Sequence, residues 1–339
     1  MDKCLLSLLV ILLCSNNLSA NIFRVNNALS TDPTQKIYNT ILEANNAATV
    51  AAGDTLMIEG STTNYGNTTL SKRLVLFGPG YFLTANPQTQ ASPLQAVLYN
   101  LTLGSAASGT VIAGLSFHPA SGSYTPYINN ASNIVIMRCY LPSPVVIIGT
   151  VSNVQIIQNY FVGTALDINS TAYTFNNISL KNNYIGAALS IASADTYQRI
   201  FSSVENNIFN GNVALTATIF RSNIIVPTTA TVTISSGSIE NNLVSNGQLP
   251  TSNGNQTYVA ANLFAGAAGN STDGQYKLKA GSPYLAAGYN GIQPGIFGGT
   301  TAYVLSGQPP VPAIYQFTAD GFVNKQDGLP INIKVKANQ

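Results

Sequence analysis

A short phrase recurs along the middle of this chain: a few alternating residues, one or two asparagines, and then an apolar pair. It reads "ISLKNNYI" at residues 178–185 and "SSVENNIF" at residues 202–209. Repetition at a spacing of about 20 residues is typical of a solenoid, in which each repeat forms one turn and stacks on its neighbours. The recurrence therefore restricts the chain to a repeat architecture.

The repeats have the periodicity of strands and not of helices. In "ISLK", Ile178 and Leu180 share one face while Ser179 and Lys181 share the other, which is the period of two of a β-strand. The asparagine that ends each polar pair recurs after 24, 24, 16, 19 and 20 residues, at Asn159, Asn183, Asn207, Asn223, Asn242 and Asn262. In "NIVIMRCYL", Cys139 occupies the same position of the repeat. We expect length differences between repeats to fall in loops.

These six asparagines predict a stacked structural ladder. Parallel strands in successive turns lie about 4.8 Å apart, so equivalent side chains meet from turn to turn. Asparagine tolerates the left-handed backbone conformation of a sharp bend better than most residues. Stacked amides also hydrogen-bond to one another in β assemblies. We therefore place each ladder asparagine in a bend between two strands and assign it a structural role, not a catalytic one.

The two ends of the chain differ from the repeats. Residues 36–52 gather Ile37, Ile41, Leu42 and Ala48 on one helical face, which predicts a helix that caps the first turn. Beyond residue 300, "GQPPVPAIYQF" is a proline-rich linker of extended character. The tail then alternates in "INIKVK", which predicts a short strand segment.

Taken together, the capping helix, "GDTLMIEG" (53–60), "LSKRLVLFGPGYF" (70–82), the "NNYI" repeats and "YKLKAGSPYLAAGYNGIQPGIFGG" (276–299) resemble the secreted bacterial β-helix proteins of the pectate-lyase-like superfamily. The resemblance covers roughly residues 22–300. It implies an all-β fold, a right-handed parallel β-helix over residues 21–300 with an N-terminal capping helix. Residues 301–339 then form a linker and a short C-terminal β appendage. The superfamily includes lyases, hydrolases and adhesins, so the resemblance indicates a fold more than an activity.

The first twenty residues predict a secretory signal peptide. Lys3 supplies a positive start, an apolar stretch follows from Leu5 to Leu13, and Ala20 ends a small-residue cleavage site. Lipid attachment at Cys14 is the less favoured alternative, because Leu13 precedes it. Cleavage would leave Cys139 alone, which excludes an internal disulfide framework. No later segment is apolar enough to span a membrane, so we expect a secreted or cell-surface protein.

Charge argues against several classes of function. Only 8% of the residues are charged and the net charge is +2, so no basic surface indicates nucleic-acid binding. Two positions before the ladder, Lys181, Glu205, Arg221 and Glu240 alternate in sign and should stack about 5 Å apart. They form either an active-site stripe or a surface ladder of ion pairs. We favour the surface ladder, because its charges compensate one another.

Other signs of catalysis are weak. The single histidine, His118, has no second histidine or cysteine as a metal-ligating partner, and we predict no metal and no cofactor. No G-x-S-x-G motif supports a nucleophilic serine. A glycoside hydrolase needs two carboxylates that converge in one cleft, and the acidic residues are scattered along this sequence. An enzyme therefore remains the alternative to a binding module.

Tyrosine offers the stronger indication of binding, since the chain has seventeen tyrosines and no tryptophan. Tyr160 and Tyr184 hold equivalent positions after the ladder asparagine, so an outward tyrosine stripe could contact a polysaccharide or surface glycan through ring faces and hydroxyls. Further candidate binding residues are Tyr124, Tyr127, Lys72 and Arg73. The favoured function is glycan binding or adhesion. The alternatives are a polysaccharide lyase or hydrolase, and a spacer whose partner binds the C-terminal appendage.

Overall fold

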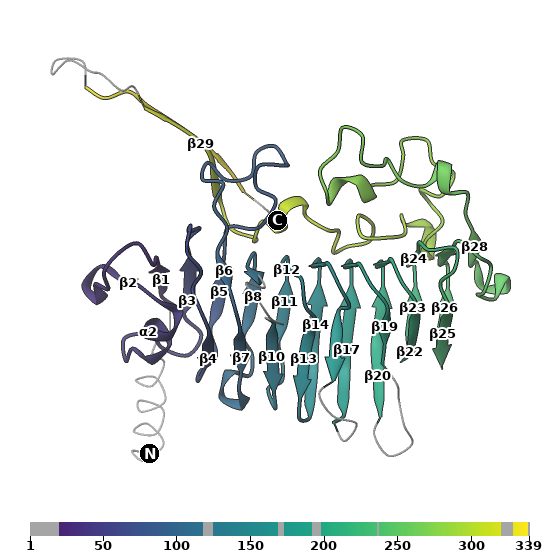
Figure 1. The fold of residues 1–339 in the computed structure, drawn as a ribbon, viewed down its shortest axis with the longest axis horizontal. Coiled ribbons are helices and arrows are strands. Elements are labelled where there is room, and N and C mark those ends of the chain that lie inside the picture. The colour runs from purple at the N-terminus through teal and green to yellow at the C-terminus, as the bar shows by residue number, and fades with distance from the viewer. Residues whose placement is uncertain are drawn as a thin grey trace, which may run out of the picture.

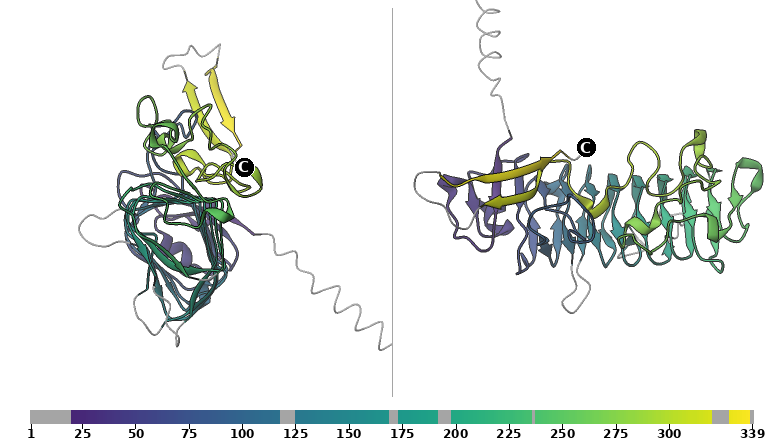
Figure 2. Two further views of the ribbon diagram at one scale, coloured as in Figure 1. Left: turned by 90° about the vertical axis from the view of Figure 1, so that its right-hand side faces the viewer. Right: turned by 90° about the horizontal axis from the view of Figure 1, so that it is seen from above.

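The computed structural model describes residues 20–117, 125–168, 173–191, 198–235, 237–319 and 328–337. Over these residues the chain is an all-β parallel β-solenoid, as the repeats predict. Its turns lie side by side along the long axis of the molecule (Figure 1), and a view along that axis shows one closed coil (Figure 2). The predicted signal peptide lies outside the described residues except for Ala20.

Sheet A is the largest of the three sheets of the coil, with 14 strands. Its strands, in chain order, are β1 (Ile22–Val25), β2 (Ile37–Tyr38), β3 (Thr55–Ile58), β5 (Val75–Phe77), β8 (Val111–Ala113), β11 (Val135–Met137), β14 (Val151–Ile157), β17 (Phe175–Lys181), β19 (Leu189–Ser190), β20 (Arg199–Glu205), β22 (Val213–Ala217), β23 (Ile219–Arg221), β25 (Val232–Ser235) and β26 (Ser238–Glu240).

Sheets C and B complete each turn. Sheet C contains β6 (Val97–Leu98), β9 (Ser116–Phe117), β12 (Tyr140–Leu141), β15 (Tyr160–Phe161), β18 (Tyr184–Ile185), β21 (Ile208–Phe209), β24 (Ile224–Ile225), β27 (Leu243–Val244) and β28 (Gln256–Thr257). Sheet B contains β4 (Thr68–Leu70), β7 (Leu101–Leu103), β10 (Pro126–Asn129), β13 (Val145–Ile148) and β16 (Leu166–Ile168). The chain passes from sheet A to sheet C to sheet B in each of the middle turns.

The core is a stack of apolar side chains that point into the coil. In sheet A, Ile156 pairs with Leu180, and Leu180 pairs with Val204, in parallel register. All three side chains are fully buried, while their neighbours in each strand face outward. Period-two alternation in the sequence thus becomes one inner and one outer face, and burial of the inner face provides the main stabilisation.

A buried asparagine ladder runs along the corner between sheets A and C. The Oδ1 atom of Asn207 accepts from the backbone nitrogen of Asn183 at 3.0 Å and from its Nδ2 atom at 3.1 Å. Nδ2 of Asn183 also donates to the carbonyl of Ile156 at 2.8 Å. The same pattern repeats from Asn159 to Asn242, and Oδ1 of Asn159 accepts from the backbone nitrogen of Cys139. Each amide therefore joins successive turns.

The last member of this ladder is Asn255 and not Asn262. Oδ1 of Asn255 accepts from both the backbone nitrogen and Nδ2 of Asn242, at 3.0 and 2.9 Å. Asn262 ends the 3-10 helix η4 (Ala260–Asn262) and is exposed, so the prediction for this residue was wrong. The apolar pair that marks the other repeats becomes Gln256 and Thr257 in the final turn, because this turn is exposed to solvent. The recognisable sequence pattern is therefore missing there.

The left-handed backbone lies one residue earlier than predicted. Asn182 and Asn206, which precede the ladder asparagines, have φ values of 54° and 55°. The equivalent residues of the other turns also adopt positive φ: Arg138, Gln158, Ser222 and Asn241. The first residue of each pair thus turns the chain and points its side chain outward, while the second points inward and joins the ladder. This division of roles explains why two polar residues recur together.

A return segment, residues 258–312, runs back along the outside of this corner (Figure 1). It includes the 3-10 helices η4, η5 (Gly274–Tyr276), η6 (Tyr289–Gly291) and η7 (Leu305–Gly307). The outward corner side chains bind its carbonyls: Nδ2 of Asn182 donates to Ile296 at 2.9 Å and Gly298 at 2.7 Å. Nδ2 of Asn206 donates to Gln293 and Gly295.

Both ends of the chain are simpler than the middle. Helix α2 (Ile41–Asn46) packs against β1 to β4 and is much shorter than the predicted range 36–52. Three further 3-10 turns are η1 (Pro33–Gln35), η2 (Ser105–Ala107) and η3 (Thr251–Asn253).

The tail forms an antiparallel pair, β29 (Ala313–Ala319) and β30 (Ile331–Lys336), which projects from the coil (Figure 1). None of the helices in the described part of the chain is long and apolar enough to span a membrane.

The contribution of the asparagine ladder to the free energy of unfolding can be measured by substitution. Asn183→Ala and Asn207→Ala should each lower the free energy of unfolding by about 1–3 kcal/mol, because each change leaves buried backbone groups without partners. Asn262→Ala is the matched control and should change it by less than about 0.5 kcal/mol, because this side chain is exposed. Denaturant titration followed by circular dichroism measures all three. Equal effects at the three positions would contradict the observed ladder.

Candidate functional site

The outer face of sheet A carries a polar hollow of about 290 Å³ over strands β14, β17 and β20. Side chains at outward positions of neighbouring strands line it, and Gln155 pairs with Ser179 and Ser179 with Ser203 in register. The complete lining is Asn153, Gln155, Ile157, Asn177, Ser179, Lys181, Ser202, Ser203 and Thr301. Amide and hydroxyl groups thus predominate, and no carboxylate is among these lining residues.

A local irregularity in β20 adds to this surface. Ile178 pairs with Phe201, whereas Ser179 pairs with Ser203, so Ser202 is an extra residue in β20. Such bulges redirect side chains and are common beside functional sites. Here the bulge brings two adjacent serines, Ser202 and Ser203, to the hollow. Ser202 Oγ donates to the carbonyl of Ile178 at 3.1 Å, which fixes its orientation.

An exposed amide row borders the hollow at the beginning of these strands. Nδ2 of Asn177 donates to Oδ1 of Asn153 at 2.8 Å, and Nδ2 of Asn153 donates to Oδ1 of Asn133 at 2.9 Å. All three residues adopt positive φ. A primary amide has two N–H groups and two oxygen lone pairs, so even Asn153, the middle member, keeps hydrogen-bonding capacity for a ligand. A second hollow of about 570 Å³ lies at the start of the same strands, next to Ser152 and Asn176.

The return segment forms the opposite wall. Thr301 lines the hollow, and its Oγ1 atom donates to Oδ1 of Asn182 at 2.7 Å. Nε2 of Gln158 donates to the carbonyls of Thr301 and Ala302. The corner residues therefore hold this wall in place through backbone carbonyls, and the hollow becomes a groove between the wall and the amide row.

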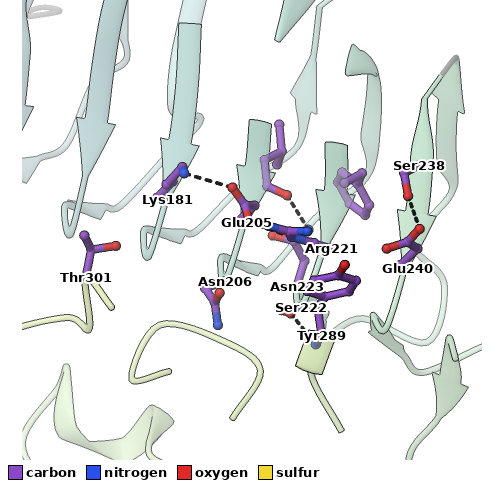
Figure 3. Close-up of polar contacts among 12 residues, drawn as sticks. Lys181, Glu205, Asn206, Arg221, Ser222, Asn223, Ser238, Glu240, Tyr289 and Thr301 are labelled. Carbon is purple, nitrogen blue, oxygen red and sulfur yellow. Dashed lines mark hydrogen bonds and ion pairs between the residues drawn. The ribbon is translucent and has the colours of Figure 1, made fainter. Parts of the chain in front are cut away.

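Two ion pairs lie beside Lys181, at the end of the hollow where β17 and β20 finish (Figure 3). Glu205 receives Lys181 Nζ at 2.9 Å and Arg221 Nε at 2.7 Å, on opposite sides of its carboxylate. The guanidinium of Arg221 also lies 4.1 Å from the ring centre of Tyr289 in the return segment. All four residues stack in register as predicted, and Glu240 pairs with Arg221 in the next strand, but its carboxylate accepts from the hydroxyl of Ser238 and not from Arg221. The predicted row of four is therefore present, and its first three members form an ion-paired triad.

The surroundings of Glu205 set its protonation state. Burial raises the pKa of its carboxyl, but hydrogen bonds and charge attraction from Lys181 and Arg221 outweigh burial and hold the pKa below its usual value of 4.5. A general acid in a glycosidase needs the opposite shift, to a raised pKa. Glu205 thus lacks the electrostatics of a proton donor, and each of its oxygens already has a partner.

The tyrosines do not form a free surface. The rings of Tyr160 and Tyr184 stack at 4.6 Å, close to the predicted rung spacing, but both side chains are less than 10% exposed. Tyr276 of the return segment covers them, with its hydroxyl donating to that of Tyr184 at 2.8 Å, and Phe82 packs edge-on against Tyr160. Burial raises the pKa of Tyr160. The predicted outward stripe was wrong because the return segment seals it.

The remaining candidates lie elsewhere on the molecule. Tyr127 is a half-buried residue of β10 in sheet B, and Tyr124 and His118 fall outside the described residues. Nζ of Lys72 donates to the carbonyls of Ala47 and Val50, which fixes the loop after helix α2. Arg73 is exposed and packs over Gly53. Among the described residues, no three histidine, cysteine or acidic side chains gather where they could hold a metal.

The sequence patterns did not single out the groove residues, because each is an ordinary polar residue in an outward strand position. The sequence nevertheless indicated them, because Gln155, Ser179 and Ser203 share one outward position of the repeat, two residues before Ile157, Lys181 and Glu205. No protein-family model matches this chain, and searches of curated proteins and of solved structures found no match either. The geometry of the described residues therefore carries the functional argument.

The lowered pKa of Glu205 predicts a pH-dependent contribution to stability. This contribution is present above the unfolded pKa and is lost as the pH falls through about 4.5 toward the folded value. Glu205→Gln should therefore be less stable than the wild-type protein at neutral pH, and the two unfolding curves should converge as the pH falls from about 5 to about 3. Glu240→Gln serves as the control, because Glu240 lies outside the triad. A constant difference across this range would contradict the assignment.

Proposed function

We propose that this protein is a secreted or cell-surface β-helix module that binds glycan in the polar groove on sheet A. The observation that carries the proposal is the groove itself: amides and hydroxyls in register at the rung spacing, between a fixed wall and an amide row. Sugars present closely spaced hydroxyls that both donate and accept. Asparagine, glutamine and serine side chains can complement them without a net charge.

Charge compensation favours a neutral or weakly charged glycan. Lys181, the one cation among the described residues that line the groove, lies 2.9 Å from Glu205, so its field is largely cancelled at the groove. Binding by amides and hydroxyls is weakly sensitive to ionic strength, whereas binding of an acidic polymer by cations is screened by salt. The signal-peptide features of residues 1–20 support export, and the resemblance to the pectate-lyase-like superfamily supports a polysaccharide as ligand.

The alternative is a polysaccharide lyase or hydrolase. Glu205 is the carboxylate that pairs with Lys181 of the groove lining, so an enzyme would use Glu205, with Lys181 as a candidate base or charge-neutralising group. The two-sided ion pairing of Glu205 argues for the binding module. If glycan-degrading activity is found, Glu205→Gln should leave most of it intact. A fall in rate by several orders of magnitude would instead show that Glu205 is catalytic and that the protein is an enzyme.

The groove is tested by filling it. Ser179→Trp should abolish retention on the glycan that a glycan-array screen identifies, because the indole would occupy the centre of the hollow. Thr102→Trp is the matched control: Thr102 has the same outward, partly exposed setting on sheet B, and its variant should bind normally. Retention of the wild-type protein should change less than about twofold between low and high salt. Normal binding by Ser179→Trp, or collapse at high salt, would place the site elsewhere.

A further inference from the structure

The C-terminal ribbon, β29 with β30, is a two-stranded antiparallel sheet that extends away from the coil (Figures 1 and 2). Its base is attached to the body: Ala313 is buried, and the carbonyl of Ile314 accepts from the backbone nitrogen of Ala91 at 2.8 Å. The rest of the ribbon is largely exposed. A two-stranded sheet of this kind is marginally stable in water by itself, which indicates that another surface covers it.

One face of the ribbon is apolar and the other is polar. Cross-strand pairing joins Phe317 with Ile333 and Ile314 with Val335, which places these side chains on one face together with Ile331. Each of these five side chains is between 44% and 56% exposed. Pairing also joins Gln316 with Lys334, on the opposite face. The ribbon therefore carries a continuous row of half-exposed apolar side chains.

The apolar face continues into a hollow of about 430 Å³ at the base of the ribbon. Ile314 belongs to both, and Met57, Phe77 and Val311 line the hollow beside it, with Glu59, Gln90 and Ser92 also in its lining. The apolar surface of the ribbon therefore does not stop at its own strands but extends onto the outer face of the first turns of sheet A. A partner that packs on the ribbon can gain further contacts at this base.

The distribution of charge selects the occupant. Both lysines of β30, Lys334 and Lys336, lie on the polar face, and the apolar face has no charged side chain among the described residues. An identical apolar face meets no like charge when it packs against its copy. We propose that the ribbon is a self-association surface, in which the apolar faces of two copies pack together across a twofold axis.

The size of the face sets the strength of this contact. Five half-exposed side chains of this size present on the order of 100 Å² each, so that two copies bury about 1,000 Å² in total. This area lies at the lower end of specific protein interfaces. The dimer is therefore a weak, reversible one, and its isologous geometry leaves the lysines of both copies on the outside.

Sedimentation equilibrium of the purified protein from about 1 µM to about 200 µM tests the proposal. The wild-type protein should show a concentration-dependent monomer–dimer equilibrium. The double variant Phe317→Ser, Ile333→Ser should raise the dissociation constant at least tenfold, because hot-spot side chains dominate such contacts. Its coil should keep the wild-type circular dichroism spectrum. The double variant Lys334→Gln, Lys336→Gln alters only the polar face and should dimerise normally.

Cross-linking gives an independent measurement of which face is in contact. Ile333→Cys should form a disulfide-linked dimer on mild oxidation, whereas Asn332→Cys, on the opposite face of the same strand, should not. A protein that stays monomeric across the concentration range would overturn the proposal. So would equal loss of dimer in the lysine variant, or sedimentation with anionic phospholipid vesicles by a protein that is monomeric in solution.

Discussion

The structure depends on one buried acceptor in each middle turn, the side-chain oxygen of the ladder asparagine. It accepts from a backbone N–H and from an amide of the preceding turn, as Asn207 does from Asn183 at 3.0 and 3.1 Å. At a sharp corner the backbone cannot continue the strand ladder, and an unpaired buried N–H would be costly. The amide supplies this partner and fixes the stacking of the turns at the same time. Glutamine is longer and aspartate would bring charge into the core, so asparagine recurs.

The inward asparagine determines what the residue before it can do. That residue turns the chain through the left-handed region and must direct its side chain outward, as Asn182 and Asn206 do. A row of outward donors at the corner then binds backbone carbonyls of the return segment, with Arg138 and Gln158 in the same row as Asn182 and Asn206. Ser222 occupies the equivalent position in the next turn, and its hydroxyl oxygen accepts from the backbone N–H of Tyr289. The return segment is held mainly through its backbone, and its own side chains are free to pack over the tyrosines. Covering sheet C in this way leaves the outer face of sheet A available.

Sequence periodicity was sufficient for the repeat fold, the strand faces and five of the six ladder positions, because each depends on the same repeat position within a turn or in the adjacent turn. It failed at Asn255, where the flanking apolar pair is replaced by Gln256 and Thr257. It also failed for Tyr160 and Tyr184, whose burial depends on Tyr276, about a hundred residues away in the chain. The groove shares this cause, since Thr301 completes it from the return segment. Contacts between turns can be derived from a repeat, but contacts with a segment outside the repeat cannot.

The stability of the fold and the shape of the groove therefore depend on the same contacts. The corner residue Asn182 both anchors the return segment and orients Thr301, which is the wall of the groove. Lys181, one residue earlier, faces the groove and is neutralised by Glu205. Glu205 in turn pairs with Arg221, which stacks on Tyr289 of the return segment. The charges of the outer face thus serve to hold the return segment and cancel one another, so that uncharged amides and hydroxyls are what remain in the groove to meet a ligand.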